Sequence, residues 1–317
     1  MSSTTLRPAT IAAQAAHALD AAEAAQALDP TSGTASQRRD VPPQQDAPAL
    51  RARGLTLSYD GRRVVEGLDL DVPAGKVTVV VGPNGCGKST VLRGLSRLLR
   101  PTEGHVHLAS TDSHDDVWSL RPKEFARRVA LLPQSPPLPE GITVVDLVGR
   151  GRHPHHTLVR RWSAADDAAV MEAMRATGTV GLAERHVEEL SGGQRQRVWI
   201  ALTLAQQTDI VLLDEPTTYL DVAHQIDVLD LLRDLNRTQG TTVVMVLHDL
   251  NLAARYADHV VAMRDGRLVG SGAPADLVDE DFVARVFGLG SRVIADPVTG
   301  APLVVPTSTH QQTGAPA

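Results

Sequence analysis

Short apolar runs recur along the middle of the chain and predict the strands of a buried sheet. The run at residues 76–81 leads into a cluster of glycines and then into an apolar-periodic segment, which predicts a helix at residues 88–99. Three further apolar runs of strand length alternate with helical patterns; they lie at residues 129–132, 210–213 and 242–247. This alternation is typical of an α/β domain with a parallel sheet.

Roughly alternating apolar and polar positions predict antiparallel hairpins at both ends of this region. Residues 52–59 and 64–72 alternate on either side of Asp60-Gly61, a dipeptide that favours a turn. Residues 293–305 show a second hairpin pattern around a turn that contains proline and glycine.

Helical periodicity is clearest in the second half of the chain. Residues 222–237 place five apolar side chains on one face, and Gly240 follows the end of the pattern. These five are Val222, Ile226, Leu229, Leu232 and Leu235. Residues 276–287 are also expected to form a helix. Between residues 135 and 206 the strand patterns disappear and helical ones such as 164–176 replace them, which predicts a helical subdomain inserted into the α/β core.

The two ends of the chain differ in composition from the middle. Residues 1–48 are rich in Ala, Gln, Asp, Ser and Pro and lack large apolar side chains, so we expect a disordered extension, with helical propensity at residues 11–28. Residues 307–317 are expected to form a flexible tail. The folded domain is therefore predicted at residues 49–306.

Composition and charge exclude several classes of protein. The hydrophobic fraction of 42% supports a folded core, and the net charge of −6 argues against a dedicated nucleic-acid binder. The one cysteine, Cys86, excludes a disulfide framework and suggests a reducing compartment. The longest apolar runs are far shorter than the roughly 20 residues that a membrane span needs.

The sequence GPNGCGKST at residues 82–90 fits the phosphate-loop pattern G-x-x-x-x-G-K-[ST]. Glycines let backbone amides turn toward phosphate oxygens, and the following helix presents its positive end. We expect Lys88 to reach the β- and γ-phosphates of a nucleotide and Ser89 to bind Mg²⁺. The candidate nucleotide-binding residues of the loop are Gly82, Pro83, Asn84, Gly85, Cys86, Gly87, Lys88, Ser89 and Thr90.

Two further motifs complete the candidate chemistry. An apolar strand ends in Asp214 and Glu215, which predicts Mg²⁺ binding by Asp214 and a general base in Glu215. In LSGGQRQR, at residues 190–197, Ser191 and two glycines precede a helical run and form a second possible anion site. One nucleotide does not need two such sites, so one of them is expected to act on a neighbouring molecule. The alternative for Ser191 is a simple helix N-cap.

With these motifs in this order, about residues 50–305 resemble the nucleotide-binding subunit of an ABC transporter. The resemblance implies a RecA-like P-loop NTPase core of α/β class, with an antiparallel β-subdomain and an inserted helical subdomain. It implies that ATP and Mg²⁺ are the cofactors and that ATP is hydrolysed. By position, the resemblance also implies roles outside the phosphate loop. Tyr59 would stack on adenine, Gln134 would contact Mg²⁺ and His248 would contact the γ-phosphate. Asp221 would contact the partner subunit, and a signature motif would act on the partner's nucleotide; its residues are Ser191, Gly192, Gly193 and Gln194.

Four segments narrow the resemblance to the ATPases of ferric-siderophore importers: residues 149–155, 213–221, 224–232 and 246–258, together with the closing segment 296–306. Such proteins work as homodimers under integral-membrane permease subunits, on the cytoplasmic face of the cell membrane. An extracytoplasmic siderophore-binding protein supplies the cargo. Haem and cobalamin importers are close relatives and remain alternatives for the cargo.

Two functions from other classes fit the sequence less well. A soluble ABC-type ATPase acting on DNA or ribosomes usually has two cassettes or a long coiled coil, and this sequence has one phosphate loop and no sustained heptads. A small-molecule kinase shares the phosphate loop but has no use for LSGGQ or His248.

The segment at residues 150–161 holds four arginines and three histidines. Three interpretations remain open: a solvated basic loop, a docking site for the permease, and metal binding by the histidines.

Overall fold

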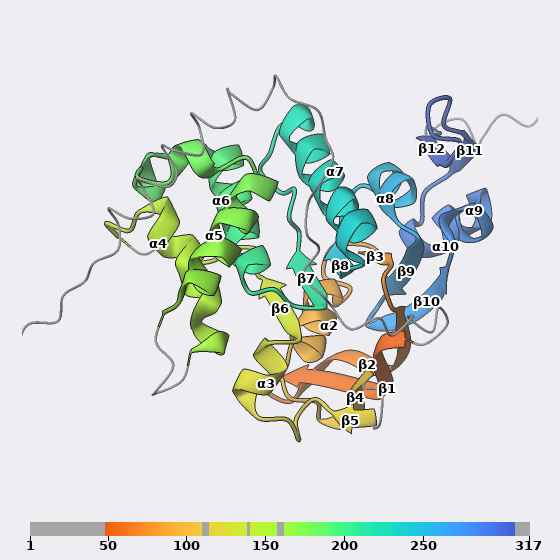
Figure 1. Cartoon of the computed structure of the whole chain (residues 1–317). Helices are drawn as coiled ribbons and strands as arrows, with labels where there is room; N and C mark the ends of the chain where they lie inside the picture. The colour runs from red at the N-terminus through yellow and green to blue at the C-terminus, as the bar shows by residue number, and fades with distance from the viewer. Residues whose placement is uncertain (1–47, 110–113, 138–139, 157–161, 308–317) are drawn as a thin grey trace, which may run out of the picture. The chain divides into compact units, whose positions relative to one another are not determined.

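The computed structural model describes residues 48–109, 114–137, 140–156 and 162–307 (Figure 1). The predicted N-terminal extension, up to residue 47, and the tail after residue 307 lie outside these residues. The described chain divides into two compact units. One holds residues 137–206, and the other holds residues 48–136 together with 207–307. None of the helices in the described residues is long and apolar enough to cross a membrane.

The larger unit begins with an antiparallel sheet of strand order β2-β1-β4-β5. Its strands are β1 (Pro48–Tyr59), β2 (Arg62–Pro73), β4 (Glu103–Ala109) and β5 (His114–Asp116). The first two strands form the predicted hairpin, and its turn has positive φ at both Asp60 (48°) and Gly61 (79°). Positive φ at both positions is the geometry that suits a tight hairpin turn. The hairpin prediction is therefore confirmed.

The central sheet of the same unit has the strand order β10-β9-β3-β8-β7-β6. Its strands are β3 (Val77–Val81), β6 (Val129–Leu132), β7 (Ile210–Asp214), β8 (Thr242–Val246), β9 (His259–Arg264) and β10 (Arg267–Gly272). Neighbouring strands are parallel except for the antiparallel pair β9–β10. All residues of β3, β7 and β8 are buried, which explains why these strands read as continuous apolar runs. The prediction of a parallel α/β sheet is confirmed.

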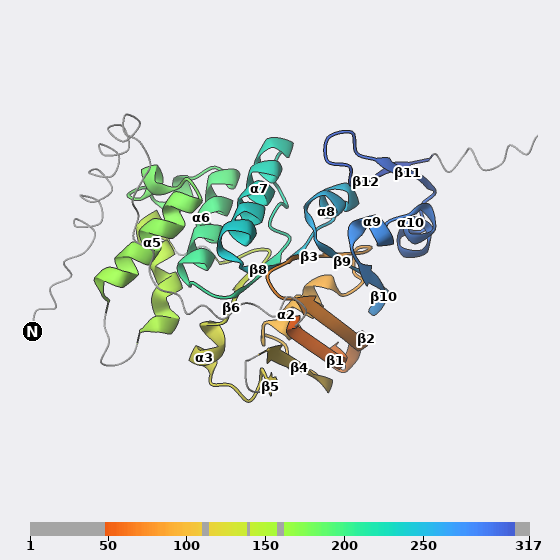
Figure 2. The same cartoon turned by 45° about the vertical axis from the view of Figure 1, so that its right-hand side comes forward.

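Helices of the larger unit are α2 (Lys88–Leu95), α3 (Pro122–Ala126), α7 (Val222–Gln239), α8 (Leu250–Tyr256), α9 (Pro274–Leu277) and α10 (Glu280–Phe287) (Figure 2). The C-terminal hairpin prediction is confirmed by β11 (Ser291–Ala295) and β12 (Pro302–Pro306). Asn251 of α8 holds this hairpin, because its amide donates to Val304 O (3.2 Å) and accepts from Val304 N (2.7 Å).

Three details of the helix predictions were wrong. Helix α2 stops at Leu95 rather than at residue 99, because the chain turns through a positive φ of 62° at Arg97. The single helix expected at 276–287 is interrupted where the extended Asp279 caps α10 by accepting a hydrogen bond from Phe282 N at 2.6 Å. Val222, assigned to the apolar face of α7, is 75% exposed, and Val228 is buried there instead.

The smaller unit is helical. It contains α4 (Val144–Gly149), α5 (Ala164–Ala176), α6 (Gly192–Ala205) and 3-10 turns at Arg150–His155, Val180–Leu182 and Val187–Glu189. Helices α4 and α5 pack against α6 and against each other. In the described residues of this unit, β-structure is limited to one isolated bridge between Thr143 and His186.

A buried ion pair holds the smaller unit together. Arg152 Nε donates to Asp166 Oδ1 at 3.0 Å, and the side chains are 5% and 0% exposed. Arg152 also donates to Ala205 O at the end of α6 (2.7 Å), while Asp166 accepts from Ser163 at the start of α5. The interpretation of 150–161 as a solvated basic loop is therefore wrong for Arg152, because this side chain joins α5 to α6 from inside the unit.

Removing one partner of this pair is expected to destabilise the smaller unit. Asp166→Ala leaves the Arg152 charge buried without its carboxylate, which typically costs about 3–5 kcal/mol of unfolding free energy. The control Glu172→Ala changes an exposed carboxylate on the same helix and should cost less than about 0.5 kcal/mol. Denaturant unfolding measures both. Equal midpoints for the two variants would contradict the structural role of Asp166.

The difference between wild type and Asp166→Ala is also expected to shrink in acid. Burial by itself would raise the pKa of Asp166, but hydrogen bonds from Ser163 and Arg152 outweigh it and hold the pKa below its ordinary value. The stabilisation is therefore complete at neutral pH and is lost as the pH falls through this lowered pKa. Repeating the unfolding measurement at acid pH tests the sign.

Candidate active site

Three loops follow adjacent parallel strands and meet at one edge of the central sheet. Val246 pairs with Val80 of β3 on one side and with Asp214 of β7 on the other. Because all three strands run in the same direction, their carboxyl ends lie together. This edge therefore brings together three parts that are distant in the sequence: the glycine loop, the Asp214-Glu215 pair and His248. A pocket of about 520 Å³ opens there.

The glycine loop has backbone angles that require glycine. The φ values of Gly82, Gly85 and Gly87 are 148°, 76° and 102°. A Cβ atom at Gly82 would lie 2.1 Å from the carbonyl oxygen of Met263, so no side chain fits there. The loop leads directly into α2, whose first residue is Lys88. The buried Lys88 ammonium donates to Gly82 O (2.9 Å) and Pro83 O (3.0 Å), which closes the loop around it.

Ser89 and Asp214 meet between α2 and β7. The Ser89 hydroxyl donates to Asp214 Oδ1 at 2.8 Å. Burial raises the pKa of Asp214, and the nearby Glu215 acts in the same direction, while the Ser89 hydrogen bond opposes the rise. The hydroxyl and carboxylate oxygens at this point are of the type that Mg²⁺ prefers.

Glu215 is held from both of its carboxylate oxygens. Oε2 accepts from Gln134 Nε2 (2.5 Å) and from the Thr218 hydroxyl (3.0 Å), and Oε1 lies 2.6 Å from His248 Nε2. Glu215 itself has a positive φ of 54°, which is unusual for a residue with a side chain. The contacts fix the direction of the carboxylate, and the role of Glu215 as a general base stays a prediction.

Most of the predicted nucleotide residues line the pocket, and some do not. The lining includes Asn84, Gly85, Gly87, Lys88, Ser89, Thr90, Gln134, Glu215 and His248. Gly82, Pro83, Cys86 and Asp214 lie outside this lining. Cys86 is buried, and burial raises the pKa of its thiol.

Tyr59 also lies outside the pocket lining. It is 37% exposed, and its hydroxyl accepts a hydrogen bond from Arg93 of α2 at 3.0 Å. Its assignment to adenine stacking stays a prediction.

Sequence reasoning missed three lining residues, Val64, Thr218 and Tyr219. Of these, Thr218 makes the most direct contact, because its hydroxyl donates to Glu215. Thr218 follows Glu215 by three residues, and Thr218 N donates to Glu215 O (3.3 Å). A hydroxyl at that spacing after the candidate base was the available indication in the sequence.

The signature residues lie in the smaller unit, at the start of α6. Ser191 is the N-cap: its hydroxyl accepts from Gln194 N (3.3 Å), and Ser191 N donates to Gln194 Oε1 (3.2 Å). Ser191 and Gly192 are exposed, and Gly193 is buried. The N-cap alternative thus describes this structure, and action of the four residues on a neighbouring molecule stays a prediction.

Asp221 is the N-cap of α7. Its Oδ1 accepts from His224 N (2.9 Å) and lies 2.6 Å from His224 Nδ1. These two contacts hold the pKa of Asp221 below its usual value. On either side of Asp221, the apolar side chains of Tyr219 and Val222 are 91% and 75% exposed.

Comparison with known proteins identifies the family. The family model described as "ABC transporter" matches residues 65–218. The achromobactin transport ATP-binding protein CbrD of Dickeya dadantii is 54% identical over 258 residues, which cover 81% of this chain and 94% of the relative. The ferric enterobactin transport ATP-binding protein FepC of Escherichia coli is 52% identical over 257 residues, with 81% and 93% covered.

Solved structures agree with this assignment. A metal-chelate type ABC transporter in an inward-facing conformation matches with a TM-score of 0.71 and 28% identity, covering 83% of this chain and 98% of the other. The motifs therefore lie in the fold that the sequence resemblance implied. The chain belongs to the ABC transporter family and is one of its ATP-binding, ATP-hydrolysing subunits.

Proposed function

We propose that this subunit hydrolyses ATP to drive the uptake of ferric siderophores across the cytoplasmic membrane. The observation that carries the chemistry is the position of Glu215 in the phosphate-loop pocket, where Gln134, Thr218 and His248 hold its carboxylate. The cargo is inferred from relatives whose names include ferric enterobactin transport and from the matched segments that resemble siderophore-importer ATPases.

In the proposed reaction, the amides of residues 84–90 and the Lys88 ammonium hold the β- and γ-phosphates of ATP. Glu215 takes a proton from the attacking water, and His248 orients the γ-phosphate. Lys88 must leave the carbonyl oxygens of Gly82 and Pro83 to meet a phosphate, so nucleotide binding exchanges these hydrogen bonds for stronger charge-assisted ones.

We assign Mg²⁺ to Ser89, Asp214 and Gln134. The first two already lie within hydrogen-bond distance, and all three side chains carry hard oxygen atoms. Bound there, the ion supplies positive charge that neutralises the transferring phosphoryl group. The assignment is based on the oxygen atoms that Ser89, Asp214 and Gln134 offer as metal ligands.

The working form is proposed to be a homodimer, in which Ser191, Gly192, Gly193 and Gln194 complete the partner's ATP site. The exposure of Ser191 and Gly192 supports this, because they are accessible to a second chain. Asp221 would contact the partner, and the exposed side chains of Tyr219 and Val222 beside it offer apolar surface for burial in such a contact.

The proposal extends to partners and organisation. Integral-membrane permease subunits would bind the ATPase at the cytoplasmic face of the membrane, with the helical region at about residues 135–206 as the docking part. An extracytoplasmic siderophore-binding protein would deliver the cargo. Residues 49–306 would form the ATPase domain, to which the structure adds Pro48 as the first residue of β1.

Replacing the candidate base is expected to separate ATP binding from hydrolysis. Glu215→Gln keeps the size of the side chain but removes its basicity, so phosphate release should fall by about 10²–10⁴-fold while ATP still binds. The variant should also accumulate as an ATP-bound dimer, which size-exclusion chromatography detects. Glu184→Gln, at an exposed position, is the matched control and should keep wild-type turnover. Near-normal turnover of Glu215→Gln would remove Glu215 as the base.

Loss of the phosphate-loop cation is expected to weaken ATP binding itself. Lys88→Ala removes the charge that meets the β- and γ-phosphates, which should lower ATP affinity by about 10–100-fold, the value of a charge-assisted hydrogen bond. Equilibrium binding of a fluorescent ATP analogue measures this change. The exposed Lys76→Ala serves as the control. Unchanged affinity in Lys88→Ala would contradict the phosphate-loop assignment.

The cargo is tested in a deletion strain supplied with radiolabelled iron complexes. Wild type should restore uptake of a catecholate or a hydroxamate siderophore, and Glu215→Gln should not. Failure with every iron complex, together with intact ATPase activity of the purified protein, would exclude siderophore import and leave the ATPase. Uptake of haem or cobalamin would then identify the alternative cargo, whereas stimulation by nucleic acid would point to the soluble class of ABC ATPase.

A further inference from the structure

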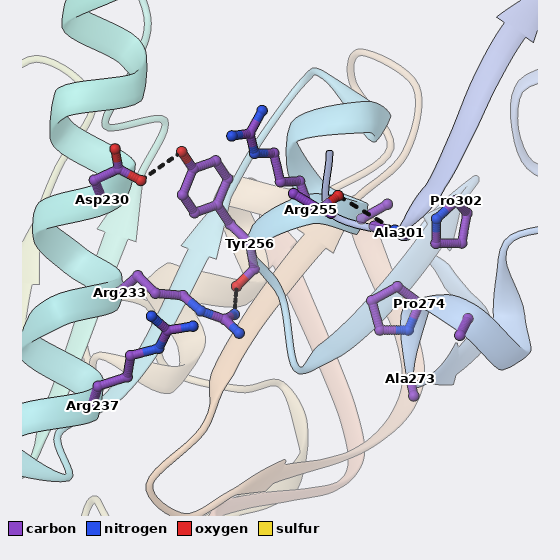
Figure 3. Close-up of a pocket in the computed structure, with 13 residues that line it drawn as sticks. Asp230, Arg233, Arg237, Arg255, Tyr256, Ala273, Pro274, Ala301 and Pro302 are labelled. Atoms are coloured by element: carbon purple, nitrogen blue, oxygen red, sulfur yellow. Dashed lines mark hydrogen bonds between the residues drawn. The ribbon is translucent and has the colours of Figure 1, made fainter. Parts of the chain in front are cut away.

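A second pocket of about 520 Å³ lies in the larger unit, lined by the C-terminal halves of α7 and α8 (Figure 3). The start of α9 and the β11–β12 turn complete its lining. We call it the arginine pocket and define it by Arg233, Arg237, Arg255, Tyr256, Pro274 and Pro302. None of its lining residues belongs to the lining of the phosphate-loop pocket.

Two arginines of the same charge stand one turn apart on α7. Arg233 is held in place, because it donates to Tyr256 O (2.5 Å) and lies 3.6 Å from Asp258 Oδ1. Arg237, four residues later, has an exposed guanidinium with which no residue of the described ranges forms a hydrogen bond or ion pair. Like charges at this spacing on a helix repel each other. An anion bound between the two guanidinium groups would attract both of them and offset their repulsion.

Three acidic groups in or near the pocket already accept hydrogen bonds. Asp230 Oδ1 accepts the Tyr256 hydroxyl at 2.8 Å, as Figure 3 shows. Asp258 Oδ2 accepts from Val77 N (2.9 Å), and Asp296 Oδ1 accepts from Val298 N (2.7 Å) and Thr299 N (3.1 Å). The lining itself carries three guanidinium groups and one carboxylate, so it has a net positive charge.

The side of the pocket across from Arg233 and Arg237 in Figure 3 is apolar and is formed by Ala273, Pro274, Ala301 and Pro302. The small side chains of Ala254 and Ala275 also belong to the lining. A volume of about 520 Å³ lies in the range of small-molecule sites and greatly exceeds what a bare inorganic ion fills. The pocket thus combines a cationic side with an apolar side.

We propose that the arginine pocket binds a small organic anion, with its phosphate or carboxylate group on Arg233 and Arg237 and its apolar body against the alanine and proline side. Arg233 is pre-oriented by Tyr256 and Asp258, so it loses little side-chain entropy on binding. Arg237 supplies the second guanidinium and gains an acceptor that the described residues do not provide. Arg255, whose guanidinium carbon lies 5.7 Å from the centre of the Tyr256 ring, adds a third positive charge to the lining.

Calorimetric titration of the full chain tests this site, with the nucleotide site saturated by ADP. Phenyl phosphate should bind once per chain, and inorganic phosphate should bind at least about fivefold more weakly because it leaves the apolar side uncovered. Phenol, which lacks the charge, should not bind. Benzoate tests whether a carboxylate serves as well as a phosphate. Absence of saturable binding by both phenyl phosphate and benzoate would overturn the proposal.

The variant Arg237→Gln assigns the binding to this pocket. It should weaken phenyl phosphate binding by about tenfold, the effect of losing one charged donor. Arg175→Gln is the matched control, since Arg175 is also exposed in the last turn of a helix, α5. ATP turnover of Arg237→Gln should equal that of wild type, which separates this proposal from the ATPase assignment. Equal phenyl phosphate affinity in the two variants would place the binding elsewhere.

Discussion

The complete burial of three parallel strands is the constraint on which the larger unit depends. The strands β3, β8 and β7 are buried along their whole length and pair in parallel, and parallel neighbours need crossover connections such as α7, which joins β7 to β8. Their carboxyl ends then fall at one edge. The residues that follow these ends, Gly82, Glu215 and His248 among them, are brought together by the packing of apolar residues that take no part in chemistry.

Much of this fold could be predicted because the sheet leaves a simple pattern in the sequence. Mostly apolar runs of strand length identified β3, β6, β7 and β8 within one or two residues. The sequence did not identify β4, β5, β9 and β10, and the wrong helix boundaries lie where a local interaction decided the outcome. The stop of α2 before Arg97 and the break before α10 at Asp279 depend on single backbone angles and caps, and periodicity does not report these.

The burial of Arg152 could not be predicted for a different reason. Four arginines and three histidines within twelve residues indicate a solvated surface, and only the pairing of Arg152 with Asp166 makes burial of one of them tolerable. In the sequence, Asp166 is recognisable only as part of the N-terminal capping of α5 with Ser163, and nothing there indicates that it also pairs with Arg152. Pairings of this kind depend on how the helices pack, and their packing is not encoded in either segment alone.

The candidate site likewise has features that the sequence predicted and features that it did not. Spacing rules found the phosphate loop and the Asp214-Glu215 pair, because each motif is short and lies next to a strand or helix end, whereas the resemblance to ABC transporter subunits supplied His248. The same rules could not show that Lys88 rests on the carbonyls of its own loop or that Thr218 donates to Glu215. These contacts depend on the loop conformation, including the positive φ of Glu215, which no residue type in the motif requires.

The hydrogen bond from the Tyr256 hydroxyl to Asp230 joins α8 to α7. Helix α7 starts at the N-cap Asp221, and α8 starts at Asp249, directly after His248. Burial, together with Asp230, raises the pKa of Tyr256 to about 12, so the phenol keeps its proton at any pH at which cells live. The hydrogen bond therefore keeps its donor proton through the neutral and mildly alkaline range, and over that range it joins the middle of α7 to the end of α8.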